Sequence, residues 1–216
     1  MDASQRVSIA KRVAQDIPEG SYVNLGIGLP TLVADFFTDK EVILHSENGV
    51  LGQWSQAEEG AEDWDLINAG KEPIELKAGG AFFHHADSFG MMRGGHLDYC
   101  ILGAFQVSAN GDLANWHTGK PDDIPSVGGA MDLASGAKNV FVMMQYLTRE
   151  GDCKILENCS YPLTGLGCVN RVYTDVGIFE FDHGKVYLLD VFEPYDVDYI
   201  KSTCEIKIDY TKLNSK

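Results

Sequence analysis

The chain has 216 residues, of which 44% are hydrophobic and 23% charged, the balance of a globular protein large enough to bury a sizeable core. Its formal net charge of −15 argues against a nucleic-acid partner, whose usual footprint is a basic stripe. The longest apolar runs, such as residues 140–144, are too short to cross a bilayer, and the first residues lack the apolar stretch of a signal peptide. These features predict a cytoplasmic protein.

The cysteines predict reduced thiols rather than a disulfide framework. There are five of them, an odd number, and no two are spaced as Cys-x-x-Cys. Both facts also argue against a structural zinc site. We expect the thiols to pack in or near the core. The five are Cys100, Cys153, Cys159, Cys168 and Cys204.

The first fifty residues predict a βαβ unit. An apolar stripe of helical period predicts a helix over residues 2–16, followed by a strand over 22–25. The turn Gly26-Ile27-Gly28 then leads to a second helix that begins near Pro30, and a strand follows over 42–45. This order implies parallel pairing of the two strands in a layered α/β domain.

The rest of the chain continues the alternation of short elements. We expect buried strands, short helices, a hairpin and a last helix, and a polar surface loop at the acidic segment 58–65. The expected strands are 99–102, 141–144 and 172–173, the helices 86–92, 131–137 and 195–203, and the hairpin strands 178–181 and 186–189. No linker, repeat or low-complexity tract divides the chain, which predicts one domain over residues 1–216.

The stretch from His45 to Gly49 is the strongest candidate for chemistry. A buried strand stops at Glu47, and Asn48-Gly49 supplies residues that tolerate a sharp turn. Open α/β sheets bind ligands at the carboxyl ends of their strands, so a glutamate presented there could react with a substrate. The alternative is an ordinary turn with a solvated glutamate.

Two glycine turns could aim backbone N–H groups at a ligand. Gly26 and Gly28 lie between a strand and a helix and could cradle a phosphate or thioester, although their spacing matches neither the GxGxxG nor the P-loop pattern. Gly128 and Gly129 precede another helix and could donate hydrogen bonds to a developing oxyanion. Taken alone, each turn is explained as well or better by tight packing.

A second group of candidates follows the double histidine, His84-His85. Adjacent histidines rarely face one ion and no metal-ligand spacing is present, so no metal site is predicted. Arg93 could bind a substrate carboxylate through its planar guanidinium. The following Gly94-Gly95 could instead mark a helix C-cap.

Taken together in chain order, five motifs resemble the B subunit of family I CoA-transferases, the 3-oxoacid type. The resemblance runs from about residue 5 to about residue 208. The motifs are Ser46-Glu47-Asn48-Gly49, Asp65-Leu66-Ile67-Asn68-Ala69-Gly70, Met92-Arg93-Gly94-Gly95-His96, Gly111-Asp112-Leu113-Ala114-Asn115-Trp116 and Gly128-Gly129-Ala130-Met131-Asp132.

The resemblance implies an open, layered α/β sheet with flanking helices, the CoA-transferase (NagB/RpiA-like) fold. It also implies that Glu47 is the nucleophile of a ping-pong reaction with a glutamyl-CoA thioester intermediate. Gly128 and Gly129 would contact the oxyanion, while Asn48 and Gly49 would shape the turn. The resemblance further implies no permanently bound cofactor, coenzyme A as part of an acyl-CoA substrate, and an A subunit that completes the site in a hetero-oligomer.

Within the family, three segments resemble the subfamily that moves CoA from succinyl-CoA to 3-oxoadipate in aromatic-compound degradation. They are residues 79–89, 114–119 and 140–144. We hypothesise that His84, His85, Arg93 or His117 binds the distal carboxylate of such a substrate; the alternative is that the histidines are structural hydrogen-bonding groups. Trp54 departs from the family pattern and could narrow the acyl pocket.

Two other functions remain open from the sequence. Acetoacetate could replace 3-oxoadipate as the CoA acceptor. A non-catalytic binding or regulatory protein could use the same fold, since fold does not fix function. The intact Ser-Glu-Asn-Gly motif argues against the non-catalytic interpretation.

Overall fold

The computed structural model describes residues 1–37, 40–126 and 128–213. The elements in chain order are α1 (Ala3–Asp16), β1 (Tyr22–Leu25), the 3₁₀ helix η1 (Leu29–Phe36), β2 (Ile43–Ser46), β3 (Val50–Gln56), β4 (Ile74–Phe82), α2 (His85–Arg93), β5 (Tyr99–Gly103), β6 (Gln106–Ser108), β7 (Leu113–Ala114), α3 (Ala130–Gly136), β8 (Asn139–Met143), β9 (Ile155–Leu156), β10 (Val169–Tyr173), β11 (Gly177–Asp182), β12 (Lys185–Val191), α4 (Val197–Thr203) and β13 (Ile208–Asp209).

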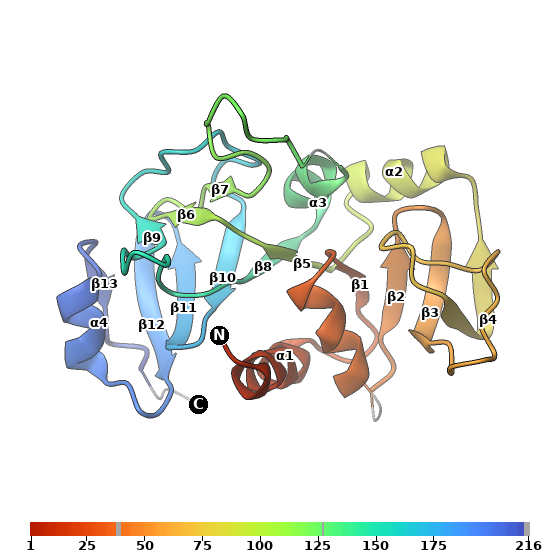
Figure 1. Cartoon of the computed structure of the whole chain (residues 1–216), viewed down its shortest axis with the longest axis horizontal. Helices are drawn as coiled ribbons and strands as arrows, with labels where there is room; N and C mark the ends of the chain where they lie inside the picture. Colours follow the sequence, from red (N-terminus) through yellow and green to blue (C-terminus); the bar gives the residue numbers. More distant parts are fainter. Residues whose placement is uncertain (38–39, 127, 214–216) are drawn as a thin grey trace.

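The centre of the molecule is a mixed sheet of ten strands in the described part of the chain (Figure 1). Its order is β13-β12-β11-β10-β8-β5-β1-β2-β3-β4. The neighbours from β10 to β2 pair in parallel, and so do β12 and β13. The pairs β2–β3, β3–β4, β10–β11 and β11–β12 are antiparallel. The parallel pairing of β1 with β2 confirms the predicted βαβ unit.

The sheet separates two apolar cores. Alternate residues of one strand enter different cores, as Cys100 and Ile101 of β5 do, because successive side chains of a strand point to opposite faces. One core contains the buried side of α1 and residues of η1. The other contains residues of α2, α3 and the small sheet β7-β6-β9. Figure 1 shows these two groups of elements on opposite sides of the central sheet.

The helix predicted from Pro30 forms as a 3₁₀ helix. Its N–H groups bond three residues back, as in Thr31 N to Gly28 O at 3.1 Å, and so does the cap bond from Phe37 N to Ala34 O at 3.2 Å. The segment is only eight residues long and follows a glycine with φ of 92°, which suits a short tight helix. It still covers the sheet as predicted, with Val33 buried.

The structure adds strands that the sequence pattern did not predict. β3 and β4 extend the sheet beyond β2 through antiparallel pairs with irregular register. Both contain glycines: Gly52 has a φ of 87°, and a Cβ there would lie 3.0 Å from Gly80 Cα. These glycines and irregularities hide the alternation by which a strand is recognised.

The other predicted elements are confirmed with shifts of one or a few residues at their ends. They include the hairpin of β11 and β12 and the terminal helix α4. The acidic segment 58–65 lies outside the helices and strands and is mostly exposed, as expected. None of the helices in the described ranges is long and apolar enough to cross a membrane.

Candidate functional site

Glu47 is the first residue of the tight turn that joins β2 to β3. Gly49 closes this turn with a φ of 112°, and its N–H donates to Ser46 O at 3.0 Å. A Cβ at Gly49 would collide with the carbonyl oxygen of Phe83, so both the backbone conformation and the space require glycine. The turn holds Glu47, which is partly exposed, beyond the carboxyl end of a central strand.

His45 fixes the strand just before this turn. Its side chain is 3% exposed and bridges two neighbours, with Asn24 Nδ2 3.0 Å from Nδ1 and Ser88 Oγ 2.9 Å from Nε2. Because the Asn24 Nδ2 group can only donate, Nδ1 accepts and the Nε2 proton bonds to Ser88. Burial lowers the pKa of His45 to about 4, so the imidazole is neutral at pH 7. The end of β2 is thereby tied to β1 and α2.

Gly129 makes room for the Glu47 carboxylate. Gly129 is the N-cap of α3 and is buried, and a Cβ on it would overlap Glu47 Oε2. The ring of Phe89 lies 3.5 Å from the same point. The carboxylate therefore lies directly against the backbone at the start of α3. Gly128 is exposed beside it and lines the same cavity.

The cavity next to Glu47 has a volume of about 540 Å³, within the range of small-molecule sites. It extends over the carboxyl ends of four adjacent parallel strands, β2, β1, β5 and β8. This is the edge at which open α/β sheets bind ligands. Glu47 and Lys154 are the two lining residues, among those the structure describes, that carry a formal charge.

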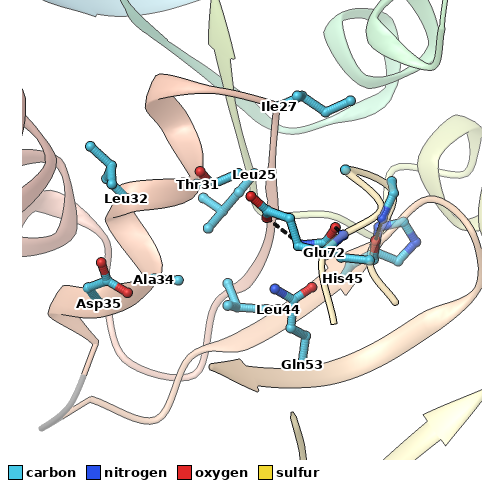
Figure 2. A pocket seen from close by; sticks show the side chains of 14 residues that line it. Leu25, Ile27, Thr31, Leu32, Ala34, Asp35, Leu44, His45, Gln53 and Glu72 are labelled. Atoms are coloured by element: carbon cyan, nitrogen blue, oxygen red, sulfur yellow. Dashed lines mark hydrogen bonds between the residues drawn. The ribbon is translucent and has the colours of Figure 1, made fainter. Parts of the chain in front are cut away.

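A second, smaller cavity of about 110 Å³ lies between η1 and strands β2 and β3. Figure 2 shows Thr31 and Asp35 on the η1 side and Leu44 and Gln53 on the strand side. Glu72 also lines it, with its carboxylate accepting from Asn68 Nδ2 at 3.0 Å. Glu47 does not line this cavity, so we place the candidate active site at the larger one.

Several lining residues were not among the candidates that the sequence suggested. Asn24 stands near the end of β1, Gln145 follows β8, and Lys154 directly precedes β9. The fold brings these three residues to the site. Asn24 and Gln145 could have been found by asking which polar residues stand at the ends of predicted parallel strands. Lys154 follows no such strand, and no signal in the sequence connects it to Glu47.

The glycine turn at Gly26-Ile27-Gly28 packs tightly and also borders the cavity, so it agrees with both the packing and the ligand-binding interpretation of the sequence. Gly26 packs tightly, with its N–H donating to Ile101 O at 2.8 Å, and also lines the cavity. Gly28 has a φ of 92° and begins η1.

Asn48 is exposed, and its Nδ2 donates to Ile67 O at 2.8 Å, so this side chain ties the Glu47 turn to the following loop.

The four residues suggested for a distal carboxylate do not line the described cavity. His84 caps α2, accepting from Ala86 N at 3.1 Å, and the His85 ring packs against Phe89. Arg93 donates from Nε to Asp132 Oδ1 at 2.5 Å, and His117 Nδ1 accepts from Gly119 N at 2.9 Å. Their substrate role stays a prediction.

The geometry settles one further expectation near these residues. Gly94 is the C-cap of α2 and Gly95 has a φ of 72°, so the C-cap interpretation of this pair is confirmed. Trp54 does not line the cavity next to Glu47; its ring lies beneath Lys77 Nζ at 4.1 Å. The idea that Trp54 narrows the acyl pocket therefore stays a prediction.

Comparison with known proteins identifies the family. The model of the coenzyme A transferase family matches residues 6–202. The chain is 59% identical over 196 residues to the B subunit of 3-oxoadipate CoA-transferase from Pseudomonas putida, covering 91% of this chain and 92% of the relative. It is 48% identical over 204 residues to the B subunit of succinyl-CoA:3-ketoacid coenzyme A transferase from Helicobacter pylori, covering 94% and 98%.

The fold is similar to that of solved structures. The crystal structure of an acyl-CoA transferase from Escherichia coli O157:H7 superimposes with a TM-score of 0.75 at 18% identity, covering 99% of this chain and 43% of that one. This match confirms the expected mixed α/β fold with a large central sheet. By sequence, the chain belongs to the coenzyme A transferase family.

Proposed function

We propose that this chain is the B subunit of a CoA-transferase that moves CoA from succinyl-CoA to 3-oxoadipate. The observation that carries the proposal is the position of Glu47, whose carboxylate lies against Gly129 in a cavity over the carboxyl ends of the parallel strands. The Pseudomonas putida relative, named for 3-oxoadipate, is more similar than the Helicobacter pylori relative named for 3-ketoacids, at 59% against 48% identity.

The chemistry we propose uses Glu47 as a covalent nucleophile. Its carboxylate attacks the acyl-CoA thioester and releases CoA thiolate, leaving an acyl-glutamyl anhydride. The thiolate then attacks the glutamyl carbonyl, which frees the donor acid and leaves a glutamyl-CoA thioester. The acceptor acid takes up CoA through the same two steps in reverse, so no water and no redox partner enters the balance.

Each addition places negative charge on a carbonyl oxygen close to the start of α3. Backbone N–H groups near Gly128 and Gly129 would stabilise that charge; the cavity that these residues share with Glu47 supports this role. The loss of one oxyanion donor typically costs about 3 kcal/mol of transition-state stabilisation.

We propose that an A subunit closes the cavity. Both relatives are named as B subunits, which implies a partner. Apolar side chains at the rim also favour a covering surface: Ile27 and Phe105 line the cavity and are 71% and 38% exposed. Large exposed apolar groups beside a substrate site are typical of an interface with another protein.

The assay that tests this function compares acceptors with the two-subunit complex. With succinyl-CoA as donor, we expect kcat/KM for 3-oxoadipate to exceed that for acetoacetate by at least tenfold. Glu47→Gln should lose activity by more than about 10³-fold, because the amide cannot form the anhydride. The matched control is Glu58→Gln, an exposed loop residue.

Two results would count against the proposal. A preference for acetoacetate would replace the acceptor while leaving the reaction class intact. An active Glu47→Gln complex would remove the covalent mechanism and reopen a non-catalytic role for this chain.

A further inference from the structure

Lys154 brings a positive charge into a cavity of a strongly acidic chain. Among the described lining residues it is the cation, and Glu47 is the anion. The chain as a whole carries −15, so an anionic substrate gains no attraction from this chain at long range. A local cation inside the cavity is therefore the group best suited to hold a substrate carboxylate.

The backbone of Lys154 is fixed from both sides. Its N–H donates to Tyr146 O at 2.9 Å, and its carbonyl accepts from Val107 N at 3.1 Å. These bonds connect the segment before β9 to the chain beyond β8 and to β6. The backbone of Lys154 is therefore held in place, and a binding group needs such support if it is to distinguish substrates by their geometry.

The side chain of Lys154 is half-buried and its charge is incompletely satisfied. Nζ donates one hydrogen bond, to Ala104 O at 2.9 Å. Within the described ranges no carboxylate lies within 4.0 Å of it. Asp175 attracts it from farther away but is itself bonded to Tyr146 N at 2.8 Å. An ammonium has three donors, so two can face the cavity.

Burial lowers the pKa of the Lys154 ammonium, and the attraction of Asp175 opposes that shift. A second carboxylate near Nζ would stabilise the charged ammonium, because its attraction offsets part of the hydration that burial removes. The structure therefore favours an anion next to Nζ when the site is filled.

The separation of the two charges suits a dicarboxylic acid. Ala104, which accepts from Nζ, follows β5, and Glu47 follows β2, with β1 between these strands. Two inter-strand spacings amount to about 10 Å. An extended six-carbon diacid has about 6 Å between its carboxyl carbons, which leaves about 2 Å at either end for contacts with Nζ and Glu47.

We propose that Lys154 binds the distal carboxylate of a dicarboxylic acid that accepts CoA, while Glu47 reacts at the other end. The inference rests on the proposed function for the identity of the reacting group, and it names the residue that selects a diacid over a monoacid. Gln145, which lines the same cavity, offers an amide that can share the carboxylate.

The kinetic test uses a matched pair of acceptors with the two-subunit complex. 3-Oxoadipate and 3-oxohexanoate have the same six-carbon skeleton and 3-oxo group but differ in the distal carboxylate. In ping-pong kinetics, kcat/KM for the acceptor reports the second half-reaction, so the carboxylate of the succinyl donor does not interfere. We expect Lys154→Met to lower kcat/KM for 3-oxoadipate by about 10- to 100-fold, and for 3-oxohexanoate by less than about threefold.

Two variants separate charge from structure. Lys154→Arg should recover part of the activity with 3-oxoadipate because it keeps the positive charge. Lys201→Met, an exposed lysine of α4, should leave both acceptors unchanged. An equal fall for both acceptors in Lys154→Met would overturn the inference, because it would show that the bond to Ala104 merely supports the fold.

A binding measurement separates this inference from the proposed reaction. Without any CoA compound, calorimetry of the complex should show that adipate binds more tightly than hexanoate and that Lys154→Met removes the difference. This result would support the role of Lys154 even if 3-oxoadipate proved not to be turned over. A wild-type complex that binds both acids equally would overturn the role of Lys154, whatever the turnover assay shows.

Discussion

His45 shows how one side chain can serve the site without touching a substrate. It stands two residues before Glu47 and hydrogen-bonds Asn24 and Ser88 in the interior. Its ring also stacks against Phe83, with the centroids 6.0 Å apart. The position of Glu47 therefore depends on a neighbour that is itself held in the interior from three directions.

The low pKa of His45 predicts a loss of stability in mild acid. The imidazole titrates near 4 in the folded chain and near 6.5 when unfolded. As the pH falls below 6.5, the unfolded chain therefore takes up a proton that the folded chain refuses. The contribution of His45 to stability is complete above pH 6.5 and is lost progressively toward pH 4. At pH 5 the loss amounts to about 2 kcal/mol.

Urea unfolding at pH 7 and pH 5 measures this effect. Other groups titrate in the same window, so the informative quantity is the difference between wild type and His45→Gln. The variant should be less stable at pH 7 and should lose about 2 kcal/mol less between the two pH values. His183→Gln, at an exposed turn, is the control and should follow the wild type. A His45→Gln profile parallel to wild type would contradict the buried, neutral imidazole.

At the scale of elements, the site depends on how closely the start of α3 approaches the β2–β3 turn. Helix α3 also packs against α2, whose Arg93 is paired with Asp132 of α3. Gly129 is the point of closest approach, since a Cβ there would occupy the place of Glu47 Oε2. The contact links two elements that are far apart in the chain.

Gly129→Ala should therefore impair catalysis more than folding. The methyl group would push the Glu47 carboxylate aside, and a displacement of about 1 Å costs on the order of 100-fold in rate. We expect kcat of the complex to fall by about that factor with little change in the unfolding midpoint. Gly90→Ala, in helix α2 with open space around its Cα, is the matched control and should keep full activity. Normal kcat in Gly129→Ala would refute the close approach.

The elements also show what could be predicted from the chain. The helical stripe of α1 and the apolar runs of β1, β2, β5 and β8 identified the parallel centre of the sheet, because buried parallel strands are nearly continuous apolar runs. β4 escaped prediction because Gly79 and Gly80 interrupt its pattern and much of it is exposed. The two-residue strands β7 and β9 are defined by pairing with β6, and two residues are too few to show an alternation of apolar and polar side chains.

At the scale of the whole molecule, the residues of the site could be predicted only where a local sequence pattern marks them. Glu47 was predictable because it follows a recognisable strand and belongs to a motif. Lys154 was not, because it reaches the cavity from a loop beyond β8 and shares the cavity with Glu47 only after the sheet has assembled. Trp54 is close to Glu47 in sequence, but its ring lies beneath Lys77 Nζ and does not line the cavity next to Glu47.

The distribution of charge and apolar surface points to an incomplete site. The cavity is open, its rim exposes Ile27 and Phe105, and the chain is strongly acidic while the proposed substrates are anions. A partner that covers the rim would exclude water from the anhydride intermediate, which would otherwise hydrolyse. The central claim, covalent catalysis at Glu47, should therefore be tested on the complete complex.

The most direct test is mass spectrometry of the two-subunit complex after incubation with succinyl-CoA. We predict a CoA adduct on the peptide that contains Glu47, its absence in Glu47→Gln, and its loss when 3-oxoadipate is added. A CoA adduct on a different residue, or an active complex with no adduct on either of its chains, would contradict covalent catalysis at Glu47.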